Sequence, residues 1–83
     1  MTYFVYLLSN RNKSKLTTYV GYTNNLLKRI KLHNSGKGAK FTRGRKWELI
    51  YFKKFATKKE AILTECYIKK NRKVRNLIKN KYK

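Results

Sequence analysis

The chain has 83 residues, of which 23 are Lys or Arg and three are acidic, so its formal net charge is +20. A chain of this length forms one domain, expected here to span residues 1–83. Its 41% of hydrophobic and 14% of aromatic residues exclude a disordered basic tail. One cysteine and one histidine exclude a disulfide framework and a zinc finger. No segment resembles a signal peptide or a membrane span, which predicts an intracellular, cytoplasmic protein, associated with the nucleoid if the source is bacterial.

The beginning of the chain predicts a β-hairpin. Residues 2–8 (TYFVYLL) and 17–22 (TTYVGY) are rich in β-branched and aromatic residues, as strands are. The polar segment 9–15 is expected to form the loop between them. Gly21, near the end of the second strand, indicates that another group approaches the backbone closely.

A helix is expected to follow the hairpin. Residues 23–25 (Thr-Asn-Asn) offer N-cap side chains for a helix that begins near Leu26 and stops near Gly36. The residues expected on its core face are Leu26, Leu27 and Ile30. The segment 36–46 (GKGAKFTRGRK) is expected to be a basic, glycine-containing loop.

The second half of the chain predicts a strand and a helix. Residues 47–55 (WELIYFKKF) have strand composition. Thr57 and Glu60 form a capping box that opens a helix through about Lys70, and a short basic helix is expected from Lys73. The order β-β-α-β-α, with this extra helix, predicts an α+β fold in which helices pack over a small sheet.

The charge predicts a nucleic acid as partner. A compact domain at +20 repels itself, and phosphate is the polyanion that relieves this repulsion. A membrane surface fits less well, because the basic segment 69–83 has few apolar members. The residues expected to contact the nucleic-acid backbone are Lys28, Lys37, Lys40, Arg43 and Arg45, with segment 69–83 as a second contact.

Each of the three carboxylates can be assigned a place. Glu60 belongs to the capping box, and Glu48 at the start of a strand is expected to be exposed. Glu65 lies on or beside the buried face of its helix, where a carboxylate is costly unless it is paired or bound to a cation. Two interpretations remain open: an ion pair with Lys69 one turn later, or a ligand for Mg²⁺.

Arg29 and His33 are four residues apart and share one helix face. The arginine can clamp a phosphate with two hydrogen bonds, and the histidine can exchange a proton near neutral pH. The alternative is a solvated basic face that ends in a histidine.

Tyrosines are frequent in the first two strands, and alternation places Tyr19 and Tyr22 on opposite faces of the sheet. A tyrosine that acts as a general base needs a pKa well below its usual value near 10, and hence positive charge close by.

Taken together, these residues resemble the GIY-YIG nuclease family. The sequence carries Phe4-Val5-Tyr6, Tyr19-Val20-Gly21, Arg29, His33 and Glu65 in that order. The longer string YVGYTNNLLKRIKLHNSGKGAKFT is similar to the small single-domain, structure-specific branch of the family. The match extends over about residues 3–70.

The resemblance implies a three-stranded antiparallel sheet flanked by helices. It also implies that the protein is an endonuclease that hydrolyses phosphodiester bonds of DNA, and we expect this DNA to be structured or damaged. It also implies one divalent ion, Mg²⁺ or Mn²⁺, bound by Glu65. Tyr19 would accept the proton of the attacking water and Tyr6 would orient water or substrate. Arg29 would hold the scissile phosphate, and His33 would assist proton transfer.

The sequence also departs from the family pattern. Phe4 replaces a structural glycine, and Tyr22 stands where some relatives carry a lysine near the reacting water. Arg29, Lys28 or the metal would then have to lower the pKa of the base. Many relatives find their target with appended domains, so this chain would read DNA with its own loops or through a protein partner. A non-catalytic basic nucleic-acid-binding protein and a ribosome-associated protein remain as alternatives, because the charge alone explains salt-sensitive binding.

Overall fold

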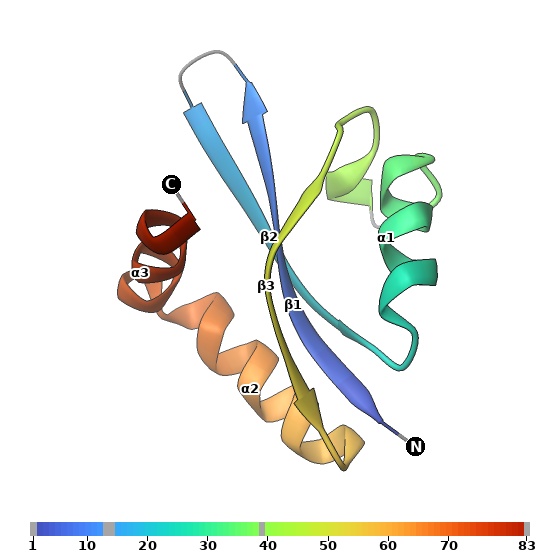
Figure 1. The fold of residues 1–83 in the computed structure, drawn as a ribbon, viewed down its shortest axis with the longest axis vertical. Helices are drawn as coiled ribbons and strands as arrows, with labels where there is room; N and C mark the ends of the chain where they lie inside the picture. Colours follow the sequence, from blue (N-terminus) through green and yellow to red (C-terminus); the bar gives the residue numbers. More distant parts are fainter. Residues whose placement is uncertain (1, 13–14, 39, 83) are drawn as a thin grey trace.

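A three-stranded sheet separates two helical layers. The computed structural model describes residues 2–12, 15–38 and 40–82, and Figure 1 shows the sheet running diagonally between the helices. β1 (Tyr3–Asn12) pairs antiparallel with both β2 (Lys15–Thr23) and β3 (Glu48–Phe55), so the strand order is β2-β1-β3. The predicted α+β fold with an antiparallel three-stranded sheet is confirmed.

β1 is buried on both faces because it is the central strand and helices pack against both sides of the sheet. Val5 and Leu7 contribute to one apolar cluster, Tyr6 and Leu8 contribute to a second, and all four residues are at most 2% exposed. A strand that is covered on both sides needs a continuous apolar run instead of an alternating one. The segment YFVYLL therefore suits the central position.

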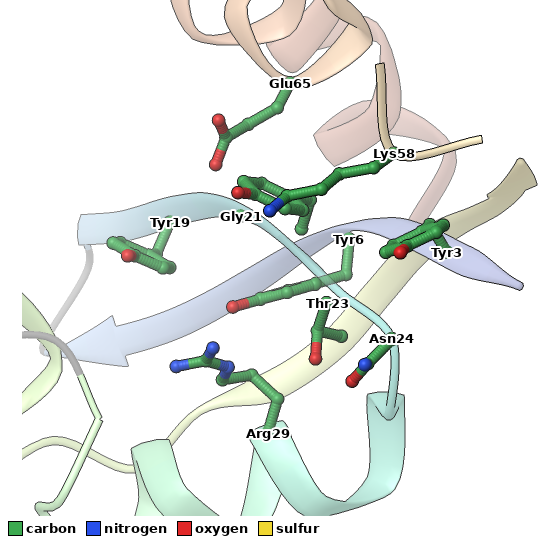
Figure 2. A pocket seen from close by; sticks show the side chains of 10 residues that line it. Tyr3, Tyr6, Tyr19, Gly21, Thr23, Asn24, Arg29, Lys58 and Glu65 are labelled. Carbon is green, nitrogen blue, oxygen red and sulfur yellow. The ribbon is translucent and has the colours of Figure 1, made fainter. Parts of the chain in front are cut away.

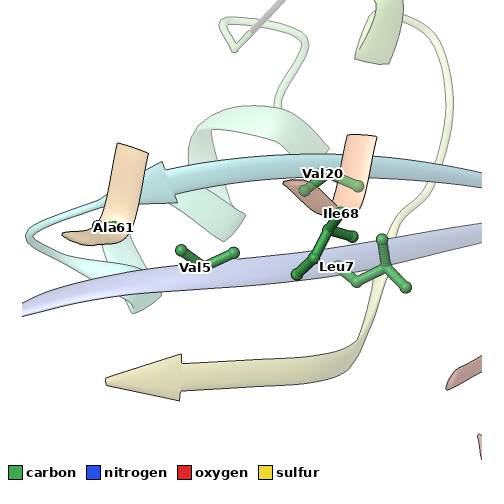
Figure 3. Close-up of a cluster of buried hydrophobic side chains, with 5 residues drawn as sticks. All are labelled: Val5, Leu7, Val20, Ala61 and Ile68. Carbon is green, nitrogen blue, oxygen red and sulfur yellow. The ribbon is translucent and has the colours of Figure 1, made fainter. Parts of the chain in front are cut away.

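α2 (Lys58–Lys70) and α3 (Arg72–Tyr82) lie on one side of the sheet in Figure 1, and α1 (Leu26–Asn34) lies on the other. Ala61 and Ile68 bring α2 into the first cluster. That cluster consists of Val5, Leu7, Val20, Ala61 and Ile68 (Figure 3). No helix within the described ranges has both the length and the apolar character that a membrane crossing requires.

The second cluster joins α1 to the opposite face of the sheet. Leu26 and Ile30 of α1 pack there with Tyr19, whereas Tyr22 packs on the α2 side, as the alternation of the strand predicted. Trp47, 4% exposed, closes this cluster just before β3 begins.

The predicted helix ends are confirmed. The side chain of Asn25 accepts a hydrogen bond from the backbone N–H of Lys28 at 3.2 Å, and Gly36 follows α1 with a φ of +80°, which glycine adopts without strain. Thr57 accepts from the backbone N–H of Glu60 at 3.2 Å and donates to its Oε1 at 2.9 Å. Glu60 is thus used in the capping box, and Glu48 is exposed as expected.

Several elements differ in extent from the prediction. Residues 9–12 continue β1 instead of forming a loop, because backbone pairing from Ser9↔Thr18 to Asn12↔Lys15 does not require apolar side chains. Residues 13 and 14 of that predicted loop lie outside the described residues. The loop over 36–46 contains a short 3₁₀ helix, η1 (Lys40–Thr42), and its residue 39 is likewise not described. α3 begins at Arg72 and runs for 11 residues.

The placement of Leu27 on the core face was wrong. Leu27 is 76% exposed, while Leu26 and Ile30, four residues apart, face the sheet. A step of one residue turns an α-helix by about 100°. α1 touches the sheet along a narrow stripe, so Leu27 points away from it.

This difference predicts unequal effects of two neighbouring substitutions. Leu26→Ala should lower the free energy of unfolding by about 1–3 kcal/mol, because it removes packed methyl groups. Leu27→Ala should change it by less than about 0.5 kcal/mol. Urea denaturation followed by circular dichroism measures both, and equal losses would contradict this packing of α1.

Candidate active site

A cavity of about 400 Å³ opens beside β2, the edge strand (Figure 2). Four of the five predicted catalytic side chains line it, each from a different element: Tyr6 from β1, Tyr19 from β2, Arg29 from α1 and Glu65 from α2. The other residues that line the cavity are Tyr3, Gly21, Tyr22, Thr23, Asn24 and Lys58. Side chains from both halves of the chain therefore converge on one space.

Gly21 makes room for Tyr6. The two residues are partners in the β1–β2 ladder, and a Cβ on Gly21 would lie 2.5 Å from Tyr6 Oη and 2.7 Å from its Cζ. The phenol thus occupies the space that a side chain at position 21 would need. This confirms the expected close approach at Gly21 and explains how a tyrosine of the central strand reaches a cavity at the edge of the sheet.

His33 does not line the cavity but lies behind Tyr6. It is 0% exposed, its Nε2 is 2.8 Å from Tyr6 Oη, and its Nδ1 is 2.8 Å from Oγ1 of Thr42. A Cβ on Gly38 would overlap the imidazole Nδ1, so the loop after α1 also packs tightly on the ring. The alternative of a solvated helix face is wrong for His33, and the imidazole reaches the cavity through the Tyr6 hydroxyl.

Burial sets the protonation of this hydrogen-bonded pair. It lowers the pKa of His33 below 6.5, and the guanidinium of Arg29 lowers that pKa further. Burial also raises the pKa of Tyr6 well above 10; Tyr19 and Glu65 add to this increase, and Arg29 opposes it. At neutral pH the pair is therefore a neutral imidazole and an intact phenol. A neutral imidazole has one donor and one acceptor nitrogen, which suits two hydroxyl partners.

Glu65 forms the ion pair that was one of its two interpretations, and it also lines the cavity. Its Oε2 is 3.5 Å from Nζ of Lys69, and its side chain, 14% exposed, also lines the cavity. Among the residues that line the cavity, Glu65 is the one carboxylate. The described part of the chain holds no group of three or more His, Cys, Asp or Glu side chains that could enclose a metal ion. Any ion bound here would take most of its ligands from water and substrate.

Two cations reach the cavity from different helices. Figure 2 shows Lys58 on the same side as Glu65 and Arg29 on the other, with Gly21 and Tyr6 between them. Over residues 2–12, 15–38 and 40–82, Arg29 makes no ion pair or side-chain hydrogen bond, so its guanidinium is available to an anion. Lys58 was not predicted from the sequence. Its signal was the spacing of seven residues to Glu65, which places both on one helix face two turns apart.

The predicted nucleic-acid contacts lie outside the cavity. Lys28 is exposed on α1, and four further cations are exposed between α1 and β3, namely Lys37, Lys40, Arg43 and Arg45. None of the five lines the cavity. Lys28 therefore contributes no direct contact to the cavity, and the local positive charge comes from Arg29 and Lys58.

A protein-family model described as the GIY-YIG catalytic domain matches residues 2–83 of the sequence. The chain belongs to the GIY-YIG family. This is a family of nucleases, and GIY-YIG nucleases act on DNA.

Relatives of this chain include small proteins of known sequence and structure. The UPF0213 protein CPE1444 of Clostridium perfringens is 53% identical over 68 residues, which are 81% of this chain and 70% of that protein. The UPF0213 protein YazA of Bacillus subtilis is 48% identical over 69 residues, 82% of this chain and 67% of that protein. The solution NMR structure of the UPF0213 protein BH0048 from Bacillus halodurans is similar with a TM-score of 0.56 at 39% identity, covering 98% of this chain and 86% of that one.

The strand register explains why the two GIY-YIG motifs have their positions. The first motif ends with Tyr6 on β1, and the second ends with Gly21 on β2, directly opposite it. Tyr19, which begins the second motif, faces the same side of the sheet as Tyr6 because it is two residues from Gly21. The antiparallel ladder thus pairs the glycine of one motif with the tyrosine of the other.

The buried imidazole predicts a dependence of stability on pH. Because the folded pKa of His33 is below its unfolded value of about 6.5, the unfolded chain binds more protons as the pH falls through 6.5. The free energy of unfolding should therefore fall between pH 7 and pH 5, by at most about 1.4 kcal/mol per pH unit.

Urea denaturation at several pH values measures this slope. The matched control is His33→Gln, which keeps hydrogen-bonding groups but does not titrate, so its slope over the same range should be close to zero. Equal slopes for the two proteins would show that another group causes the pH dependence.

Proposed function

We propose that this chain is a metal-dependent endonuclease that hydrolyses phosphodiester bonds in structured or damaged DNA. The observation that supports it most is the cavity itself, in which Tyr6, Tyr19, Arg29 and Glu65 meet from four different elements. A fold alone does not define a function, but chemically suited groups that converge in one space support one.

In this proposal Arg29 and Lys58 hold the scissile phosphate. Both line the cavity, and they approach it from opposite sides of the edge strand (Figure 2). A guanidinium can donate two parallel hydrogen bonds to phosphate oxygens, whereas an ammonium acts as a compact charge. The two cations would neutralise the phosphate and the additional charge that develops during attack by water.

Tyr19 is proposed as the group that accepts the proton of the attacking water. Tyr6 is less suited to this role, because burial raises its pKa and its hydroxyl is held by His33. An intact phenol whose oxygen is fixed can instead orient the water through a hydrogen bond. His33 would assist by fixing Tyr6 and not by contacting substrate, and becoming an imidazolium is disfavoured by its burial and by Arg29.

The donor set of the cavity fits one Mg²⁺ or Mn²⁺ ion that is bound together with the substrate. Glu65 would hold it, and Mg²⁺ commonly uses one or two carboxylates together with water and phosphate oxygens. When bound, the ion supplies positive charge at the phosphate and at the leaving oxygen. To bind the ion, Glu65 would give up its ion pair with Lys69. The loss of this pair costs little free energy, because its two charged atoms are 3.5 Å apart and Lys69 is partly exposed.

DNA outside the cavity would be held by exposed cations. Lys28 and the segment between α1 and β3 supply them beside α1, and α3 adds a second basic surface. Contacts with the DNA backbone position the substrate without reading its sequence. A protein partner would then direct the nuclease to a specific target.

The same charge also supports a non-catalytic DNA-binding protein, and a cleavage assay separates the two functions. Purified protein is incubated with Mg²⁺, Mn²⁺ or EDTA and with single-stranded, duplex, nicked, flap and branched DNA. Glu65→Gln should lower the cleavage rate by about 100-fold or more, the usual effect of removing a group that stabilises charge in the transition state.

The matched control is Glu48→Gln, which changes the net charge equally at an exposed position outside the cavity. It should cleave like the wild type. Binding of all three proteins without any metal-dependent product would favour the non-catalytic function, and unchanged cleavage by Glu65→Gln would remove the proposed metal ligand.

Arg29 and Lys28 offer a second matched pair, because they are adjacent cations on α1 but only Arg29 lines the cavity. Arg29→Ala should lower cleavage at saturating DNA by about 100-fold. Lys28→Ala should weaken DNA binding slightly and leave the rate at saturation unchanged. Equal loss of rate in both variants would contradict a specific role for Arg29.

The affinity of the wild-type protein for duplex DNA should fall as the salt concentration rises. The expected slope is about −0.9 for each phosphate neutralised, and binding measured at several salt concentrations gives it.

A further inference from the structure

A second groove, of about 350 Å³, adjoins the catalytic cavity along β2. The two spaces share Tyr19, which lines both. The residues that line this groove are Thr18, Tyr19, Val20, Phe41, Lys69 and Arg75. A DNA strand that leaves the cavity past Tyr19 would enter this groove directly.

Phe41 is the unusual member of the groove because it is aromatic and 51% exposed. Its ring is stacked on Tyr19, with centroids 6.1 Å apart and planes 20° apart, and it also lies 6.1 Å from the ring of Trp47. Its chain neighbour Thr42 is fully buried, bonds to His33, and accepts a hydrogen bond from Trp47 Nε1 through its carbonyl at 3.0 Å. The exposed ring is therefore held in place by a buried framework.

Cations lie over this ring and along the groove. Cζ of Arg45 lies 5.2 Å from the ring centre, and Lys69 and Arg75 line the groove. Arg75 is held in turn by the carbonyls of Ile68 and Lys69, to which its guanidinium donates. An exposed aromatic ring beside positive charges is the combination that binds single-stranded nucleic acids, in which the bases stack and the phosphates are neutralised.

We propose that this groove binds an unpaired nucleotide next to the scissile phosphate, with its base stacked on Phe41. The base takes the place of the Arg45 guanidinium, which is exposed and moves to a neighbouring phosphate. Base stacking on an aromatic ring is stronger than an exposed cation–π contact, so the exchange is favourable.

The proposal rests on the function proposed above and narrows its substrate class. A base inside a continuous duplex is stacked between its neighbours and cannot lie on Phe41. The preferred substrate is then DNA with an unpaired strand beside the cleavage site, such as a flap or a gap. Stacking tolerates any base, so no sequence preference arises from this groove.

The test measures binding without cleavage. In EDTA, the affinity of the 83-residue protein is determined by fluorescence anisotropy for single-stranded DNA and for blunt duplex. Phe41→Leu should weaken binding to the single strand by about tenfold and leave duplex binding within about twofold, because the loss of one stacked base affects one substrate alone. Phe41→Trp, which keeps an aromatic surface, should retain single-strand affinity.

Phe52→Leu is the matched control. Phe52 is 48% exposed on β3, packs against Phe4, and lines neither the cavity nor the groove. It should bind both DNAs like the wild type. Equal losses for Phe41→Leu and Phe52→Leu, or an equal loss of single-strand and duplex binding by Phe41→Leu, would overturn the proposal. Thermal unfolding followed by circular dichroism checks that each variant is folded.

Stacking is observed directly with 2-aminopurine, whose fluorescence is quenched when it stacks. Placed at the unpaired nucleotide of a flap, it should be quenched by the wild type and by Phe41→Trp but not by Phe41→Leu. The same flap incubated with Mg²⁺ tests the nuclease separately. Quenching without cleavage would reject the proposed function and leave the groove, whereas cleavage without Phe41-dependent quenching would reject the groove.

Discussion

The contact between the Tyr6 ring and Gly21 determines the arrangement of the site. Tyr6 is held on the central strand, yet its hydroxyl reaches the edge because residue 21 has no side chain. The same hydroxyl bonds to His33, which fixes α1, and His33 bonds to Thr42, which fixes the 3₁₀ turn. One phenol thus connects the sheet, a helix and a loop, so a change at Gly21 would disturb all three.

The sequence predicted features that depend on local pattern. Strand composition, the capping box of Thr57 and Glu60, and the alternation of Tyr19 and Tyr22 are local, and each is found in the structure. The extension of β1 through Asn12 was missed because backbone pairing, and not side-chain polarity, holds that part of the hairpin together. Composition identifies strands that are buried, and it is less informative where a strand leaves the core.

The candidate site was predicted in part. The motif order predicted that Tyr6, Tyr19, Arg29 and Glu65 would converge, and they do. Lys58 and Thr42 were not predicted, because their roles depend on how α2 and the turn dock on the sheet. The burial of His33 has the same origin: helix spacing places it beside Arg29, but the turn after α1 closes over it. Such contacts arise between elements and leave no periodic signal.

The residues that line the cavity come from elements between β1 and α2, so the ribosome makes them at different times. Glu65 and Lys58 lie in the last third of the chain. Tyr6, Tyr19 and Arg29 lie in the first half. During synthesis, the hairpin and α1 leave the ribosome first, as N-terminal segments do. A nascent chain therefore carries Arg29 before it has any carboxylate to place beside it. The acidic group arrives with α2, so a truncated product retains positive charge but lacks a complete site.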